Sequence, residues 1–174
     1  MEFPEKLKCA VRYVVSACDP IALGNVRLNK ILWKADVFTY MRTGESITNW
    51  KYIKKRYGPM IKGYDFLMSE LEEKGLILKD YATKGGREIC LIEAAGNDDS
   101  SEALSQEEKD VLDNFIDYIT RKTAQSISEE SHDKFYSIAA DGEEIPLGPV
   151  WVEPSAEDIL WAEQLVEDYD KVQA

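Results

Sequence analysis

Residues able to support catalysis or bind a metal are few and scattered in this sequence. The chain has three cysteines, Cys9, Cys18 and Cys90, and one histidine, His132, and none of them forms a CxxC or HxxxH pair. Zinc needs several converging thiolate or imidazole ligands, and a cysteine nucleophile needs a base beside its thiol. We therefore expect no metal, no cofactor, three structural cysteines, and a packing role for His132.

The carboxylates and glycines do not indicate catalysis either. Acidic pairs such as Glu72-Glu73 and Glu143-Glu144 fall on polar faces or in loops, where solvation accounts for them. The diglycine Gly85-Gly86 lies between two apolar runs that predict a hairpin, whereas a phosphate-binding loop connects a strand to a helix. We expect that the protein is not an enzyme.

A basic run with adjacent aromatics is the best candidate for a binding surface. An aromatic side chain beside long cations offers an anchor with a charged rim, which is the usual anatomy of an interface hot spot. The alternatives are a solvated face for the cations and core packing for the tryptophans. The candidate partner-binding residues are Trp50, Lys51, Lys54, Lys55, Arg56, Tyr57 and, in a later loop, Trp151.

The charge balance favours a protein partner over a nucleic acid. The 174 residues include 21 Lys+Arg and 33 Asp+Glu, a net charge of -12, which opposes binding to phosphate. Residues 1–92 hold 16 of the cations and 11 of the acids, so the two halves have opposite net charges and should attract each other. We expect a cytoplasmic protein with no membrane role, because no signal peptide or apolar span is visible.

Three amphipathic helices are predicted in the N-terminal half. The first follows Pro4 and ends at Asp19-Pro20, the second follows Gly24-Asn25 and ends at Gly44, and the third is expected to open at Gly58-Pro59 and close at Gly75. The apolar positions at helical spacing in the first are Leu7, Ala10, Val11, Val14 and Val15.

A β-hairpin centred on Gly85-Gly86 is predicted after these three helices. An acidic connector follows at residues 93–104, and then a helix with a capping box from Ser105 to Glu108. A short helix from Ser126 is expected to contain His132, residues 142–149 read as loop, and an acidic helix within 151–174 packs on the rest. The predicted fold is a single domain of mixed α+β class, mainly α with one β-hairpin, about six helices and a winged-helix-like N-terminal part.

Six short motifs, taken in order, resemble the SocA-like antitoxin family, also called the Panacea domain. The run from Leu28 to Asp36, LNKILWKAD, is similar to the family's LNKLLYFAD-like helix. The resemblance covers about residues 5–150, and residues 1–150 are expected to form the domain. The other matching segments are Gly44 to Thr48, Tyr57-Gly58-Pro59, Leu71 to Ile77, Leu104 to Asp113, and Ser131-His132.

This resemblance implies a non-catalytic antitoxin that neutralises a cognate protein toxin by direct binding. Some relatives act as proteolytic adaptors and others are encoded by phages or prophages, so a protease is a second expected class of partner. The alternative is a winged-helix DNA-binding regulator, although the third predicted helix has few cations to read bases. The family motif positions are Leu28, Asn29, Lys30, Tyr57, Gly58, Pro59, Ser131 and His132.

Overall fold

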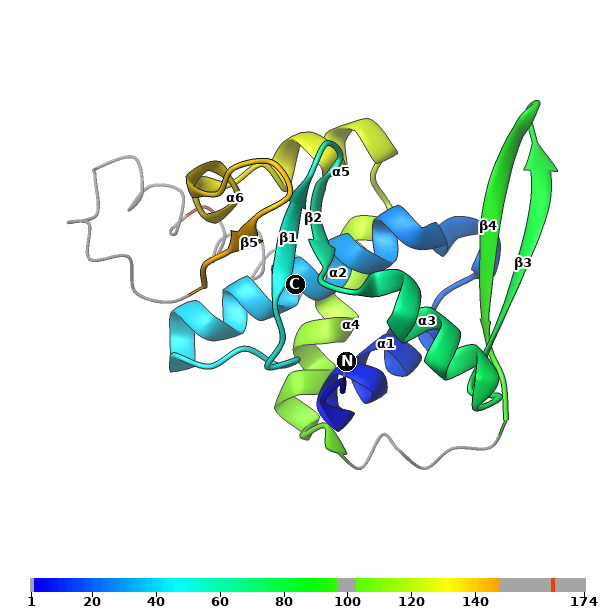
Figure 1. Ribbon diagram of the computed structural model, residues 1–174, viewed down its shortest axis with the longest axis horizontal. Helices are drawn as coiled ribbons and strands as arrows, with labels where there is room; N and C mark the ends of the chain where they lie inside the picture. Colours follow the sequence, from blue (N-terminus) through cyan, green and yellow to red (C-terminus); the bar gives the residue numbers. More distant parts are fainter. Residues whose placement is uncertain (1, 97–102, 148–163, 165–174) are drawn as a thin grey trace.

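The computed structural model describes residues 2–96, 103–147 and 164, and over these it is a mixed α+β fold (Figure 1). The class agrees with the prediction, but besides the predicted hairpin there are three further strands, which form a separate sheet. The described elements, six helices and five strands, are α1 Glu5–Ala17, α2 Pro20–Thr43, β1 Tyr52–Lys55, β2 Gly58–Ile61, α3 Tyr64–Glu73, β3 Ile77–Lys84, β4 Arg87–Ala94, α4 Gln106–Thr120, α5 Ala124–Glu130, α6 Lys134–Ile138 and β5 Glu144–Ile145.

Local signals correctly predicted the ends of the first two helices. The Asp19 side chain caps α2 by accepting hydrogen bonds from the amides of Ile21 and Ala22. Gly24, with φ 59°, interrupts α2 where the break was predicted, although one helical turn precedes it. Gly44 ends α2 in the left-handed region and donates its amide to the Tyr40 carbonyl.

The prediction that Gly58-Pro59 opens a helix was wrong, because this segment forms strand β2. It pairs antiparallel with β1, with Lys55 opposite Gly58 and Tyr52 opposite Ile61. Pro59 is tolerated because β2 is an edge strand, where a missing amide donor breaks no ladder. The third helix starts only at Tyr64, after Gly63.

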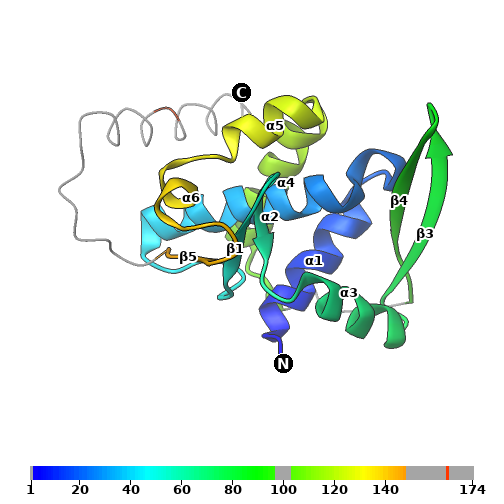
Figure 2. The same ribbon diagram turned by 45° about the horizontal axis from the view of Figure 1, so that its top comes forward.

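The second hairpin follows the prediction closely. Strands β3 and β4 pair from Ile77 opposite Ala94 to Lys84 opposite Arg87. Gly85 and Gly86 form the turn, and both have positive φ values, 58° and 75°, as a tight two-residue hairpin requires. The two strands extend away from the helices in both ribbon views (Figures 1 and 2).

The predicted helix around His132 is in fact two short helices. Ser131 ends α5, and Asp133 starts α6 by accepting the amide of Tyr136 at 2.9 Å. His132 therefore lies in the link between them. Residues 142–149, expected to be loop, contain β5, which adds to β1 and gives the sheet order β2–β1–β5.

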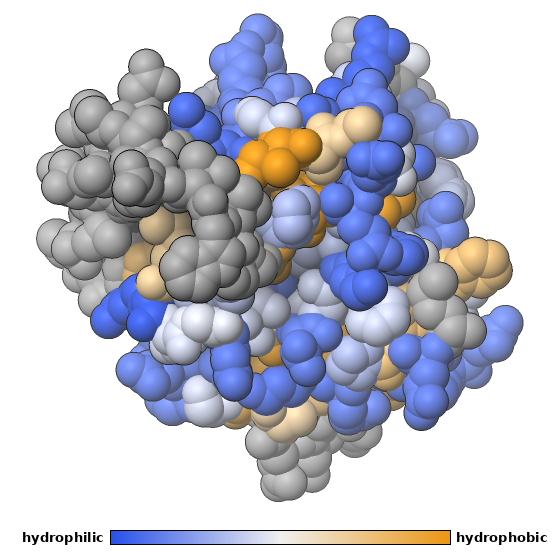
Figure 3. All heavy atoms as spheres, turned by 60° about the vertical axis from the view of Figure 1, so that its left-hand side comes forward, coloured by the Kyte–Doolittle hydropathy of each residue, from blue (hydrophilic) through white to orange (hydrophobic). Residues whose placement is uncertain are grey.

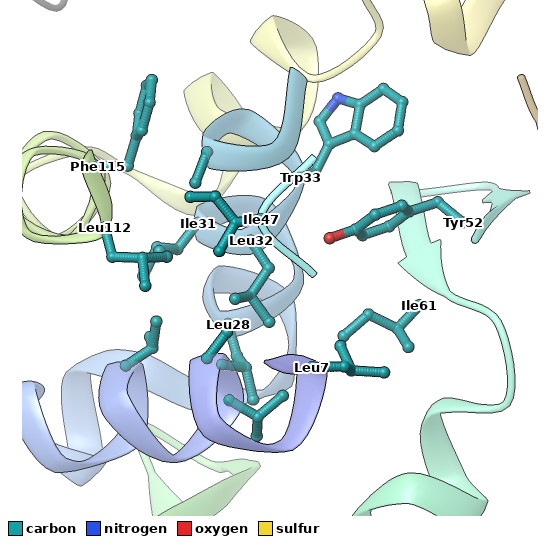
Figure 4. Packing of buried hydrophobic residues seen from close by; sticks show 14 of the residues in the cluster. Leu7, Leu28, Ile31, Leu32, Trp33, Ile47, Tyr52, Ile61, Leu112 and Phe115 are labelled. Carbon is teal, nitrogen blue, oxygen red and sulfur yellow. The ribbon is translucent and has the colours of Figure 1, made fainter. Parts of the chain in front are cut away.

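One hydrophobic core joins the two halves of the chain. The capping box at Ser105 and Glu108 is present, and α4 lays Leu112 and Phe115 against α2 (Figure 4). The rings of Phe38 and Phe115 are 5.8 Å apart, edge to face. The core cluster also includes Ile127, Tyr136 and Ile145. Residues 97–102 of the connector, Trp151 and the predicted C-terminal helix lie outside the described residues, apart from Gln164, which is helical.

Candidate partner-binding site

Three segments far apart in the sequence meet at Gly58. Lys30 comes from α2, Gly58 begins β2, and Ser131 follows α5. A Cβ atom on Gly58 would lie 1.7 Å from Lys30 Nζ and 2.5 Å from Ser131 Oγ, and Gly58 has φ 106°. A side chain here would be strained by the positive φ, and the ends of the Lys30 and Ser131 side chains would have to move to make room for it. We call Lys30, Gly58 and Ser131 the Gly58 junction.

The motif residue Asn29 holds β2 against α2. Asn29 Oδ1 accepts the outward-facing amide of Ile61 at 2.9 Å, and Asn29 Nδ2 donates to the Asn25 carbonyl at 2.9 Å. The side chain thus satisfies a backbone donor at the edge of the sheet. Leu28 is fully buried in the core beneath. Asn29 therefore positions the strand.

The amine of Lys30 is buried in the Gly58 junction. The residue is 2% exposed, and Nζ has no hydrogen-bond partner among the described residues. Burial lowers the pKa of Lys30 to about 7; the Asp133 carboxylate opposes this shift and the Lys34 ammonium adds to it. A buried ammonium without a hydrogen bond is costly, so the junction favours the neutral amine.

A second contact joins α2 to the start of α6. Trp33 Nε1 donates to Asp133 Oδ2 at 2.7 Å, and the indole packs edge to face on Tyr52 of β1, with ring centroids 5.0 Å apart. Burial raises the pKa of Asp133, against the effect of these hydrogen bonds. Sequence reasoning did not find Asp133; the available signal was an aspartate that can cap the start of a short helix.

Asp36 is the most deeply buried acid of the site. Its carboxylate accepts hydrogen bonds from the amide and hydroxyl of Thr48 and from the Tyr52 hydroxyl, the last at 2.7 Å. Burial raises the pKa of Asp36 to about 6, although these hydrogen bonds favour the ionised form. Asp36 thereby fixes the segment before β1 to α2, a role that sequence reasoning missed.

His132 packs in the link between α5 and α6. Its ring stacks on Tyr136 with centroids 4.3 Å apart and an angle of 2° between the planes. Burial lowers the pKa of His132, and the nearby charges of Lys30 and Lys54 add to this effect. Both effects favour the neutral ring. Within residues 2–96 and 103–147, no group of three or more His, Cys, Asp or Glu is arranged to hold a metal ion.

The tip of the β1–β2 hairpin, Lys55, Arg56 and Tyr57, projects beside α5 (Figures 1 and 2). All three residues are exposed, and Tyr57 retains 65% of its accessible surface. Two side chains hold the backbone of the tip: the Tyr136 hydroxyl donates to the Lys55 carbonyl at 2.9 Å, and Ser128 Oγ donates to the Tyr57 carbonyl at 3.2 Å. The hairpin tip is thus a fixed, exposed aromatic flanked by cations.

The other predicted lysines are engaged by the second half of the chain. Lys51 forms an ion pair with Glu144 at 3.0 Å, and Lys62 pairs with the same carboxylate. Lys54 donates to the Ala139 carbonyl at 3.0 Å, with its ammonium 4.5 Å from the centre of the Tyr136 ring. Lys51 and Lys54 are therefore engaged by residues 139–144, whereas Lys55 and Arg56 stay exposed at the hairpin tip.

The family follows from a match across this region. Residues 28–135 match the family of antitoxin SocA-like proteins with a Panacea domain. The chain belongs to this family. The match begins at Leu28 and ends at Phe135, so it contains every residue of the Gly58 junction and of the hairpin tip. No curated protein matches the chain, and no solved structure matches it. None of the described helices is both long and apolar enough to cross a membrane.

Trp50 lies at the opposite end of β1 from the tip of the Panacea domain's first hairpin. The indole is half-buried against Phe3, with ring centroids 5.3 Å apart, and Nε1 donates to the Lys62 carbonyl at 2.9 Å. Sequence reasoning grouped Trp50 with Tyr57, but a four-residue strand separates them.

The face in Figure 3 is largely hydrophilic, with apolar residues in small separate areas.

We expect Trp50→Ala to lower the free energy of unfolding of the Panacea-domain protein by about 2–3 kcal/mol, because a packed aromatic and a hydrogen bond are lost. Urea denaturation followed by tryptophan fluorescence or circular dichroism measures the change. Trp50→Phe is the control, since it keeps a ring against Phe3 and should recover much of the loss. Unchanged stability in Trp50→Ala would contradict a structural role.

Proposed function

We propose that this protein neutralises a cognate protein toxin by direct binding, and that the hairpin tip is the contact surface. The family supports the antitoxin role. The observation that carries the choice of surface is an aromatic side chain, Tyr57, that is 65% exposed on a backbone fixed by hydrogen bonds from α5 and α6.

A surface of this kind suits tight binding for two physical reasons. A tyrosine buries a large area for few rotatable bonds, and a backbone already held in place loses little entropy on association. Lys55 and Arg56 would steer an acidic face of the toxin toward the tip. The proposal needs no catalytic group, because occlusion of the toxin is sufficient.

The residues of the Gly58 junction fit this non-catalytic role. A lysine with a lowered pKa beside a serine is the residue pair of Ser–Lys nucleophilic catalysis. Here Lys30 and Ser131 are both buried, and Ser131 Oγ donates to the Ser128 carbonyl at 2.8 Å. We therefore assign the pair to holding the hairpin.

We also place the protein in the cytoplasm, where the free thiols of Cys9, Cys18 and Cys90 stay reduced.

The charge of α3 favours a toxin over DNA as partner. This helix precedes the β3–β4 hairpin, where a recognition helix of a winged-helix protein would be expected. It carries four acids, Asp65, Glu70, Glu72 and Glu73, and no lysine or arginine. A recognition helix of this composition would repel phosphate and offer no cation to guanine.

We expect Tyr57→Ala to weaken toxin binding by about 2 kcal/mol, roughly 30-fold, while the fold is retained. The cognate toxin, sought as the product of the neighbouring gene, is tested by rescue of growth on coexpression and by calorimetry on the purified pair. Tyr81→Ala is the matched control, because Tyr81 is similarly exposed, at 58%, but lies on β3. Equal affinities of the two variants for the toxin would show that the hairpin tip is not the contact surface.

A further inference from the structure

Opening the Gly58 junction would free the hairpin tip. Gly58 immediately follows Tyr57, and the space that a Cβ on Gly58 would need is filled by the Lys30 amine and the Ser131 hydroxyl. The same hairpin is also held by hydrogen bonds from Tyr136 and Ser128. These contacts all come from residues 124–145 or from α2. The junction therefore controls whether the hairpin stays packed against both α2 and the α5–α6 segment.

The charged groups around Lys30 do not fully compensate its ammonium. From α2, Lys34 adds a like charge. From the link between α5 and α6, Asp133 is the opposing charge, and the lowered pKa of His132 favours its neutral ring. Lys54 of β1 adds another cation near His132. Asp133 already accepts hydrogen bonds from Trp33 and the Tyr136 amide. The protonated amine therefore gains most by reaching water.

We propose that protonation of the Lys30 amine releases the β1–β2 hairpin from the α5–α6 segment, and so loosens the toxin-binding tip. In the closed state the neutral amine sits under Gly58; when it takes up a proton, hydration of the ammonium favours an open state in which Gly58 moves off Lys30. This regulation rests on the proposed function, because it acts on the same tip.

Hydrogen exchange on the complete protein, without toxin, tests this release. With the Lys30 pKa near 7 when closed and about 10.4 when hydrated, the protection factors of amides 52–61 should fall about tenfold between pH 8 and pH 6, after correction for intrinsic rates. Amides of α4 in the same sample should not change. In Lys30→Met the fall should disappear, whereas Lys74→Met, which removes an exposed ammonium, should retain it.

A second measurement covers the case in which Lys30→Met does not fold. In the unmodified protein, NMR of the lysine ε-carbons should show one lysine titrating near pH 7, in parallel with the exchange change. The proposal is overturned if hairpin protection is the same at pH 6 and pH 8, if the fall persists in a folded Lys30→Met, or if no lysine titrates below pH 9. Because no toxin is present, this experiment tests the release independently of toxin binding. Either proposal can be contradicted while the other is supported.

Discussion

Gly58→Ala should lower the free energy of unfolding by about 4 kcal/mol, a large part of the stability of a typical domain. The new methyl group would overlap Lys30 Nζ at 1.7 Å and Ser131 Oγ at 2.5 Å. Overpacking of a filled site costs about 1–3 kcal/mol, and a side chain at φ 106° adds a similar amount of strain. Equilibrium urea denaturation measures the loss.

Gly44→Ala separates the two contributions to this loss. Gly44 also has a positive φ, 81°, but a Cβ there meets nothing within 4 Å. It should cost only the conformational strain, about 1 kcal/mol. Adding Lys30→Ala to Gly58→Ala should return about 1–2 kcal/mol relative to the sum of the single changes, because one clashing group is gone. A loss at Gly58 no larger than that at Gly44 would contradict the contact.

Asp36→Ala should destabilise the protein by about 3 kcal/mol at pH 7. The change leaves the buried amide of Thr48 and the hydroxyl of Tyr52 without their acceptor, and it opens a small cavity. Thr39→Val, one turn further along α2, is the control, because the Thr39 hydroxyl is buried with no hydrogen-bond partner among the described residues. Removing that hydroxyl should be neutral or slightly stabilising.

The loss on Asp36→Ala should also depend on pH, in a direction set by the raised pKa. Burial raises the pKa of Asp36 to about 6, above about 3.9 in the unfolded chain. The folded state therefore binds more protons between pH 4 and pH 6, so stability from this group is greatest at low pH and falls as pH rises through that window. The loss should be roughly 1 kcal/mol larger at pH 5 than at pH 7.

Asp36→Asn tests the same titration with the shape of the side chain kept. It retains an acceptor for the Thr48 amide but cannot ionise, so the part of the pH dependence due to Asp36 should vanish. Thermal denaturation at pH 4, 5, 6 and 7 compares the two chains. If both chains show the same slope across this window, Asp36 is not the titrating group.

Local sequence signals determined several of the helices and turns of this protein. The apolar stripe of α1 is buried as its spacing predicts, from Leu7 to Val15. The capping box at Ser105 and the diglycine turn at Gly85-Gly86 also have the predicted geometry. Each of these features is satisfied by residues within a few positions of one another, so the neighbouring sequence contains the whole physical cause.

The sequence predicted only some of the residues and contacts that form the site. Ordered family-like motifs located Lys30, Gly58 and Ser131, but not the contact among them. Gly58-Pro59 suits a helix start as well as an edge strand, and only pairing with β1 and the hydrogen bond from Ile61 to Asn29 decided between them. A pattern of neighbouring residues cannot predict a hydrogen bond between Ile61 and Asn29, which lie 32 positions apart in the sequence.

The tertiary structure alone decided which charged and aromatic side chains are buried and which are available. Asp36 and Lys30 lie on a helix whose spacing does not mark them as core residues, and they are buried because β1, β2 and the α5–α6 link close over them. Of the basic run, Lys51 and Lys54 are engaged by residues 139–144, whereas Tyr57 stays exposed. Burial and ion pairing depend on elements separated by up to about a hundred positions, as between Trp33 and Asp133, so composition and spacing along the chain do not contain them.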